Sequence, residues 1–241
     1  MKKNIIIVGG SSDIAQSAIS EISSENYNFH VIIRDQKKSL SLTELGAHIT
    51  IGDASSEDDI KNFVNSVKEN GDIDAVLHTV GSFAVRPPHA MNKEAFESVI
   101  STNLTSAFLT LSIAGKAMLS QGHGRMVFTS SVAGSLGLVN HEAISAAKGG
   151  IESMVRSAAA TYANRGIRVN AVAPGLTNTK LASPIMSNET ASQAASQKIP
   201  IKRVGEKEEI ASVIKWLLVE APDNFTGQIL HVDGGMSNVL V

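Results

Sequence analysis

The chain has 241 residues, is 43% hydrophobic, carries a formal net charge of −2 and contains no cysteine. This length suits one sizeable core, so residues 1–241 are expected to form a single domain. The weak charge without a basic stripe argues against nucleic-acid binding. The lack of cysteine excludes disulfides and thiolate metal sites, and the histidines show no ligand spacing, so no metal is expected.

The predicted elements alternate along the chain. Strands are predicted over residues 4–8, 29–34, 47–53, 72–81, 124–131, 167–175 and 227–235. Helices are predicted over 13–24, 55–70, 92–119 (as one or two), 142–166 and 206–220, and a polar loop with a short helix over 175–205. The strands are nearly unbroken apolar runs. This pattern indicates an α/β fold: a doubly wound parallel sheet of about seven strands with helices on both faces.

The first apolar run has only four residues before Gly-Gly, which is too short for a signal peptide. No apolar run approaches membrane-spanning length. We therefore expect a cytoplasmic protein without membrane contact.

The stretch "VGGSSDIA", residues 8–15, joins the first strand to the first helix. Glycines there permit a tight turn, and a helix N-terminus supplies N–H groups for a dinucleotide pyrophosphate. Ser11 and Ser12 offer further donors. The alternative is a tight turn without a ligand, with Asp13 as the helix N-cap.

Together with "SSVAGSLG", "NAVAPG" and "TGQILHVDGGMS", this turn resembles the short-chain dehydrogenase/reductase family, and most closely its single-domain 3-ketoacyl reductases. The resemblance extends from Asn4 to Ser237. It implies a Rossmann-type sheet, a nicotinamide cofactor and usually a homotetramer formed through long helices. A dimer is the other homo-oligomer considered.

The resemblance also assigns roles to individual positions. Asn103, Ser131 and Lys148 match the active-site asparagine, the catalytic serine and the lysine that holds the nicotinamide ribose. His78 and Thr79 stand where the family has two asparagines. The positions expected to bind the cofactor are Gly9, Gly10, Ser11, Ser12, Asp13, Ile14, Arg34, Asp53, Gly81, Lys148, Pro174, Gly175, Thr177 and Thr179. Asp13 departs from the family's glycine and brings a negative charge toward the phosphates.

The family's catalytic tyrosine is missing. Its position, four residues before Lys148, holds Ile144. A positioned acid is worth roughly 10²–10⁴-fold, so simple carbonyl reduction should be impaired. His141, seven residues before Lys148, matches the longer spacing of the tyrosine in the family's enoyl-thioester reductases. It is a candidate proton donor, and the alternative is a solvent-facing loop histidine.

Two hypotheses follow from these residues. The first is an NAD(P)H-dependent oxidoreductase acting on a carbonyl or enoyl substrate with an unusual proton donor. The second is a non-catalytic subunit that assembles with an active homologue. "VIIRDQKK" offers Arg34 to the 2′-phosphate of NADP and Asp35 to the ribose of NAD, and the following lysines favour NADP. The polar loop over 176–205 is expected to cover a small-molecule substrate.

Overall fold

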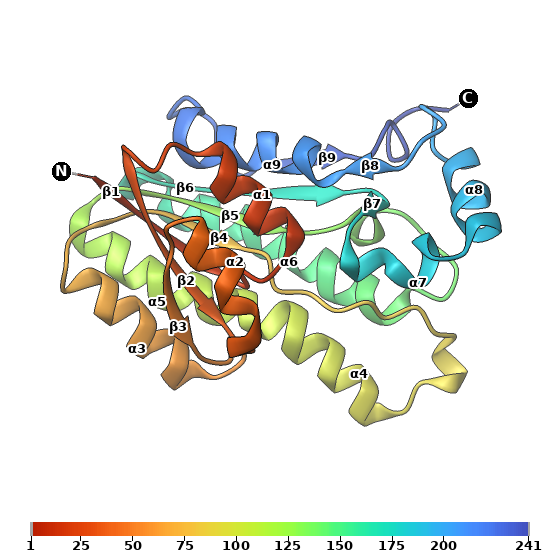
Figure 1. Cartoon of the computed structure of the whole chain (residues 1–241), viewed down its shortest axis with the longest axis horizontal. Coiled ribbons are helices and arrows are strands. Elements are labelled where there is room, and N and C mark those ends of the chain that lie inside the picture. Colours follow the sequence, from red (N-terminus) through yellow and green to blue (C-terminus); the bar gives the residue numbers. More distant parts are fainter. Residues whose placement is uncertain (1, 241) are drawn as a thin grey trace.

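The computed structural model describes residues 2–240, and its core is a seven-stranded sheet in the order β3-β2-β1-β4-β5-β6-β9 (Figure 1). The strands are β1 (Lys3–Val8), β2 (Tyr27–Ile33), β3 (His48–Ile51), β4 (Ile73–His78), β5 (Gly124–Thr129), β6 (Ile167–Pro174) and β9 (Ile229–Val232). Every neighbouring pair is parallel. The predicted doubly wound α/β sheet is therefore confirmed.

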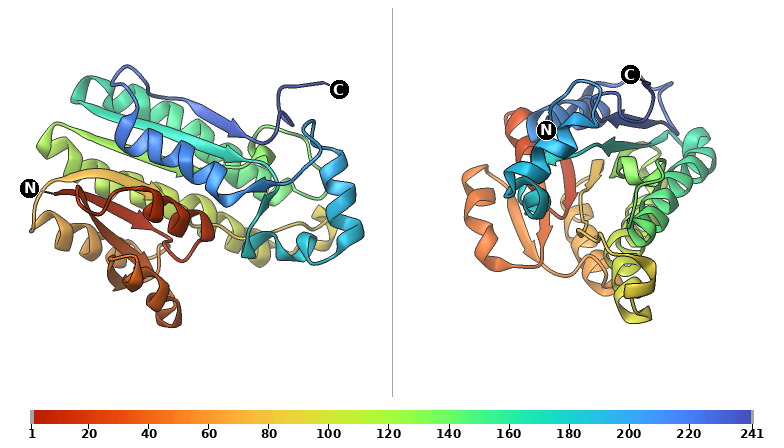
Figure 2. Two further views of the ribbon diagram at one scale, coloured as in Figure 1. Left: turned by 45° about the horizontal axis from the view of Figure 1, so that its top comes forward. Right: turned by 90° about the vertical axis from the view of Figure 1, so that its right-hand side faces the viewer.

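The strands are apolar on both sides because helices cover both faces. In β1, Ile5, Ile6 and Ile7 are all at most 1% exposed. One face packs against α1 (Asp13–Glu21), α2 (Ser39–Glu44) and α9 (Lys207–Lys215), and the other against α3 (Glu57–Lys68), α5 (Ser106–Gln121) and α6 (Glu142–Tyr162). Figure 2 shows the two helical layers edge-on. Unbroken β-branched runs are what such two-sided burial requires.

The predicted helix pattern over 92–119 corresponds to α4 (Lys93–Ile100), a π-helical turn (Ser101–Thr105) and α5. By length and composition alone this run, Lys93–Gln121, could cross a membrane. Core helices pass the same test, and Ala107, Leu111 and Ala114 pack into the main core beside α3 and α6.

The segment over 175–205 contains more structure than the single short helix predicted. It forms β7 (Thr177–Asn178), α7 (Ser183–Met186) and α8 (Glu189–Gln197), and β7 pairs with β8 (Gly205–Glu206). In Figure 1, α7 and α8 lie beyond the carboxyl ends of the strands. The helix α2 was not predicted, because its six residues are too few to show a helical repeat.

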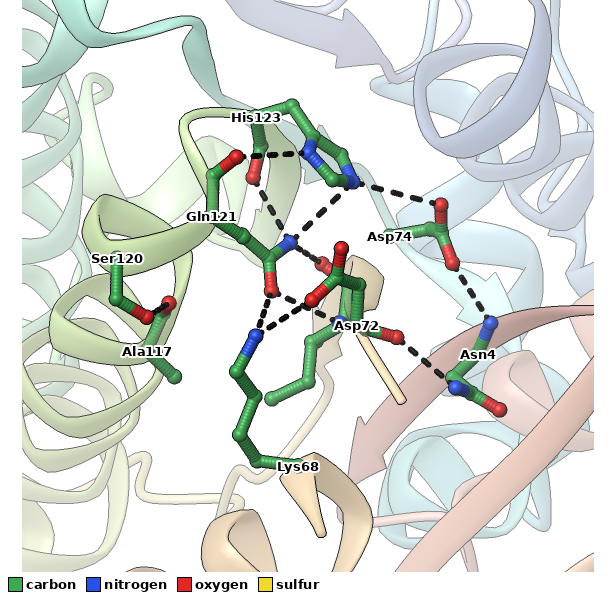
Figure 3. Close-up of polar contacts among 9 residues, drawn as sticks. Asn4, Lys68, Asp72, Asp74, Ala117, Ser120, Gln121 and His123 are labelled. Atoms are coloured by element: carbon green, nitrogen blue, oxygen red, sulfur yellow. Dashed lines mark hydrogen bonds and ion pairs between the residues drawn. The ribbon is translucent and has the colours of Figure 1, made fainter. Parts of the chain in front are cut away.

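A polar network joins the elements at the amino ends of the strands (Figure 3). The Gln121 side chain donates to the carbonyl of Ile73 (2.6 Å) and accepts from the Ile73 N–H (3.1 Å) and from Lys68 Nζ (3.0 Å). Beside it, the backbone N–H of Asn4 donates to Asp74 at 2.9 Å. These bonds fix the start of β1 and β4 against the ends of α3 and α5.

Candidate functional site

A cavity of about 1050 Å³ opens at the carboxyl ends of the strands. It is lined by residues that follow β1, β2, β4 and β5, among them Gly9, Arg34, Thr79 and Ser130. The strand order reverses between β1 and β4, and ligands of open α/β sheets bind in the crevice at such a reversal. The cavity is therefore where this fold places a ligand.

The glycine-rich turn forms the floor of the cavity beside α1. Gly9 has φ +92°, a conformation that favours glycine, and an added Cβ would lie 2.8 Å from Val80 N. The Thr79 hydroxyl donates to the carbonyl of Gly9 at 2.9 Å and fixes the turn to the end of β4. Thr79 thus supplies a hydrogen bond of its own in place of the family's asparagine.

Within residues 2–240, the backbone N–H groups of Ser11, Asp13 and Ile14 have no hydrogen-bond partner. All three residues line the cavity at the N-terminus of α1. Free N–H groups at the positive end of a helix are suited to an anion.

Two details of this turn differ from the sequence interpretation, in which Asp13 was the N-cap only in the alternative without a ligand. Asp13 is not the N-cap: Ser12 caps α1 by accepting from the Ala15 N–H. Gly10 does not line the cavity, because it faces β2, where an added Cβ would lie 2.0 Å from Val31 Cγ1. Its lack of a side chain allows α1 to start close to the sheet.

Asp13 instead reaches across the cavity. Its carboxylate accepts from the backbone N–H of Lys180 at 2.6 Å and lies 3.7 Å from Lys180 Nζ. Pro174, Gly175, Thr177 and Thr179 lead to this contact from the end of β6, and all four line the cavity. An added Cβ on Gly175 would lie 2.9 Å from Asp233 Cα, so only glycine fits this turn.

The far end of the cavity carries Arg34, Lys38 and Asp53. The backbone N–H and hydroxyl of Ser55 bind Asp53 Oδ1 and lower the pKa of that carboxyl, with a smaller effect from Arg34. Asp35 is absent from the lining and accepts from the Lys37 N–H at 3.0 Å. This end therefore presents two cations and one carboxylate to a ligand.

Lys148 and Ser131 line the end of the cavity away from Arg34 and Asp53. Lys148 Nζ donates to the carbonyl of Thr129 at 2.8 Å and has further N–H groups available. Burial lowers the pKa of Lys148 to about 8. Ser131 accepts from the Ala133 N–H, and among residues 2–240 its hydroxyl hydrogen has no acceptor. Gly81 borders this end, since an added Cβ would lie 3.7 Å from Lys148 Nζ.

Asn103 lies in the π-helical turn beneath the cavity and does not line it. Its amide donates to Ser82 Oγ (2.8 Å) and the carbonyl of Val99 (2.9 Å), and accepts from the Ser82 N–H (3.2 Å). Asn103 therefore positions Ser82, which does line the cavity. No sequence pattern pointed to Ser82, because its pairing with Asn103 joins residues 21 apart.

Ile144 has one face on the cavity and is only 7% exposed. It packs in a small apolar cluster with Val99, Ala133, Ala143 and Ala147. No acid stands in for the missing phenol at this position.

His141 lies one helical turn before Ile144, at the start of α6, and also lines the cavity. Its Nδ1 lies 2.7 Å from the carbonyl of Val139. Because a carbonyl only accepts, Nδ1 carries a hydrogen and Nε2 is the free ring nitrogen.

Two buried titratable side chains, His78 and Glu152, lie beneath the cavity, and the sequence interpretation gave neither a role in the site. His78 is fully buried, with Nε2 2.9 Å from Ser106 Oγ, and burial together with the charge of Lys148 lowers its pKa to about 3. Ser106 donates to the carbonyl of Thr102, so the His78 Nε2 carries the hydrogen. Glu152, 5% exposed, accepts from Ser130 Oγ at 2.9 Å.

These features fit a nicotinamide dinucleotide. The cavity is continuous from Arg34 and Asp53 to Ser131 and Lys148. Free N–H groups at α1 would hold the pyrophosphate, and the spare donors of Lys148 would hold ribose hydroxyls. When bound, this cofactor supplies or accepts a hydride.

The comparisons with known proteins agree with this geometry. Residues 10–237 match a family model described as Enoyl-(Acyl carrier protein) reductase. The chain belongs to the short-chain dehydrogenase/reductase family. The resemblance found in the sequence is thereby confirmed.

Curated relatives cover the whole domain. The glucose 1-dehydrogenase of Gluconobacter oxydans is 33% identical, with 98% of this chain and 92% of the relative aligned. The 3-oxoacyl-[acyl-carrier-protein] reductase MabA of Mycobacterium tuberculosis is 30% identical, covering 98% and 93%.

Solved structures show the same fold. An actinorhodin polyketide ketoreductase with NADPH superimposes with a TM-score of 0.93 at 26% identity, covering 99% of this chain and 98% of the other. ElxO with NADP bound gives a TM-score of 0.91 at 26% identity, covering 98% and 99%. Relatives of this chain thus hold a nicotinamide cofactor.

Proposed function

We propose that the protein is an NADP(H)-dependent oxidoreductase that reduces a carbonyl or enoyl (thioester-like) substrate without a tyrosine acid. The observation that carries the proposal is the continuous cavity that joins the free N–H groups of α1 to Ser131 and Lys148. The MabA and ketoreductase relatives support the substrate type.

The choice of NADP over NAD rests on the far end of the cavity. Arg34 and Lys38 both line it and would face a 2′-phosphate. The Asp35 carboxylate, which would favour a free ribose hydroxyl, is held by the Lys37 N–H away from the lining. NADPH should therefore bind more tightly than NADH.

The proton is proposed to come from His141. Its Nδ1–H is held by the Val139 carbonyl, which orients the ring and leaves Nε2 to carry the exchangeable proton. His141 and Ile144 are three residues apart on one helix and line the same cavity, so the imidazole lies near the position of the missing phenol. The free hydroxyl hydrogen of Ser131 would bind the substrate oxygen.

The test is a fluorescence titration with NADPH and NADH, followed by turnover of 3-ketoacyl and enoyl thioesters. His141→Ala should lower kcat by about 10²-fold or more without changing the NADPH Kd. His89→Ala, at an exposed turn, is the matched control. Failure of both cofactors to bind a well-folded protein would rule out the proposal.

One observation favours a second candidate, a non-catalytic subunit assembled with an active homologue. Ile144 is embedded in an apolar cluster, so the site has lost its usual acid without a substitute at that position. This candidate predicts no turnover and co-purification with a catalytic homologue. A stable homotetramer or homodimer that turns over thioesters would exclude it.

A further inference from the structure

The helix α8 presents an apolar face to the cavity. Ala191, Ala194 and Ala195 lie on one side of the helix, at spacings of three and four residues, and all three line the cavity. No residue of α8 is buried within residues 2–240. This alanine face is therefore not packed against the core of the protein, and the cavity is what it borders.

Other apolar side chains line the same cavity. Leu138, Val139 and Ile144 come from the start of α6 and the loop before it, and Ile185 from α7. Val139 is 82% exposed although it borders the cavity. Exposed apolar side chains gathered around a cavity indicate a ligand that covers them.

Carboxylate acceptors for a hydroxyl-rich substrate are few, and the other side-chain acceptors in the lining are mainly serine and threonine hydroxyls. Among the described residues, 2–240, Asp13 and Asp53 are the only carboxylates that line the cavity. Both are already engaged, Asp13 with Lys180 and Asp53 with Ser55. A sugar or polyol brings many O–H donors, and burying them without acceptors is costly.

The alanines also leave space. The cavity of about 1050 Å³ exceeds the roughly 300–1,000 Å³ usual for one small-molecule ligand, and it would hold the cofactor as well as the substrate. Because the α8 residues in the lining include three alanines, the helix fills little of this volume. A bulky ligand can therefore lie beside the cofactor.

We propose that the substrate is a bulky apolar ketone or enone, seated between the alanine face of α8 and the wall formed by Leu138 and Ile144. This inference rests on the proposed function, because it names the substrate class of the same site. A carbonyl substrate would gain a hydride at carbon from the reduced nicotinamide and a proton at oxygen, giving an alcohol. An enone would gain the hydride at the β-carbon and the proton at the α-carbon.

The test compares a bulky alicyclic ketone, 4-tert-butylcyclohexanone, with D-glucose. Binding is measured by calorimetry with and without NADP⁺, and turnover by NADPH oxidation. Ala194→Trp fills the face of α8, and Gln193→Trp places the same side chain on the same helix outside the cavity lining. We expect the ketone to bind the wild type and Gln193→Trp alike and Ala194→Trp at least tenfold more weakly. The NADPH Kd should be unchanged in both variants.

Binding of glucose without binding of the ketone would overturn the inference. So would equal ketone affinity in Ala194→Trp and the wild type. Failure of the proposed function would give a different result. The protein would then not bind NADPH, while calorimetry without cofactor would still measure binding of the ketone to the apolar face.

Discussion

The Asp13 carboxylate accepts the backbone N–H of Lys180 at 2.6 Å, joining two residues 167 positions apart. Asp13 belongs to the first turn of α1, and Lys180 begins the segment that leads into α7 and α8. The side chain of Asp13 is only 13% exposed, whereas that of Lys180 is 92% exposed. The contact with the main-chain N–H is therefore the one that holds the segment.

Asp13→Ala should loosen this segment. A hydrogen bond to a charged group contributes about 1.5–3 kcal/mol, so amide exchange at Lys180 should accelerate roughly tenfold or more. Hydrogen exchange read by mass spectrometry measures this. Asp13→Asn keeps an acceptor oxygen and should give an intermediate rate. Unchanged exchange in Asp13→Ala would show that other contacts hold the segment.

Ile144→Tyr should raise the rate of ketone reduction. The side chain at this position reaches the cavity and lies one helical turn before Lys148, whose charge lowers the pKa of a nearby phenol. In the His141→Ala background, which lacks the proposed proton donor, we expect a gain of about 10²–10⁴-fold in kcat, and in the wild type a smaller gain. Ile144→Phe adds the same ring without the hydroxyl and should give no gain. An equal gain in both variants would attribute the effect to shape and not to proton donation.

Much of this site could be predicted because its signals are local. β-Branched runs predicted the strands, the glycine-rich turn after the first strand predicted the place of Gly9, and the family resemblance assigned Ser131 and Lys148. The contact of Asp13 with Lys180 and the packing of Gly10 on Val31 join distant segments, and no local pattern encodes them. The alanine face of α8 was not predicted, because the sequence of this helix is mostly polar and does not show which side borders the cavity.

Lys148 makes cofactor affinity depend on pH. Burial lowers its pKa from 10.5 to about 8, so above about pH 8 the free protein loses the charge. If the ammonium binds the ribose hydroxyls, binding then requires proton uptake, and the Kd for NADPH should rise toward tenfold per pH unit. Fluorescence titrations from pH 7 to 10 measure this. Lys148→Met should bind weakly at every pH, and Lys198→Met should keep the slope. A flat wild-type profile would contradict the assignment.

Gln121 should contribute to stability and not to cofactor binding, because its network (Figure 3) lies at the starts of β1 and β4, whereas the cavity opens at the carboxyl ends of the strands. Gln121→Ala leaves the N–H and carbonyl of Ile73 without their side-chain partner. We expect a loss of about 2 kcal/mol in the free energy of unfolding, seen as a lower urea midpoint with an unchanged m-value. Gln193→Ala, on exposed α8, should change neither. An altered NADPH Kd in Gln121→Ala would show coupling between the two edges.

His78 should make the protein less stable in acid. Its pKa is about 3 in the folded chain, lowered by burial and by Lys148, against the ordinary 6.5 of an unfolded histidine. Between these values the unfolded chain binds a proton that the folded chain does not. The stabilisation is therefore complete above pH 6.5 and decreases as the pH falls, by up to about 1.4 kcal/mol per unit. Urea unfolding at pH 7.5, 6.5 and 5.5 measures the slope.

The matched variant is His78→Asn, which removes the titrating ring and keeps a side-chain amide for Ser106. Its slope should be shallower than that of the wild type by up to one proton. His30 contributes in the same direction, because burial and His48 also lower its pKa, so part of the slope should remain. Equal slopes in the wild type and His78→Asn would mean that His78 is protonated in the folded chain. In a protonated His78 the buried Nδ1 would carry a hydrogen and need an acceptor. Within residues 2–240 this atom has no hydrogen-bond partner.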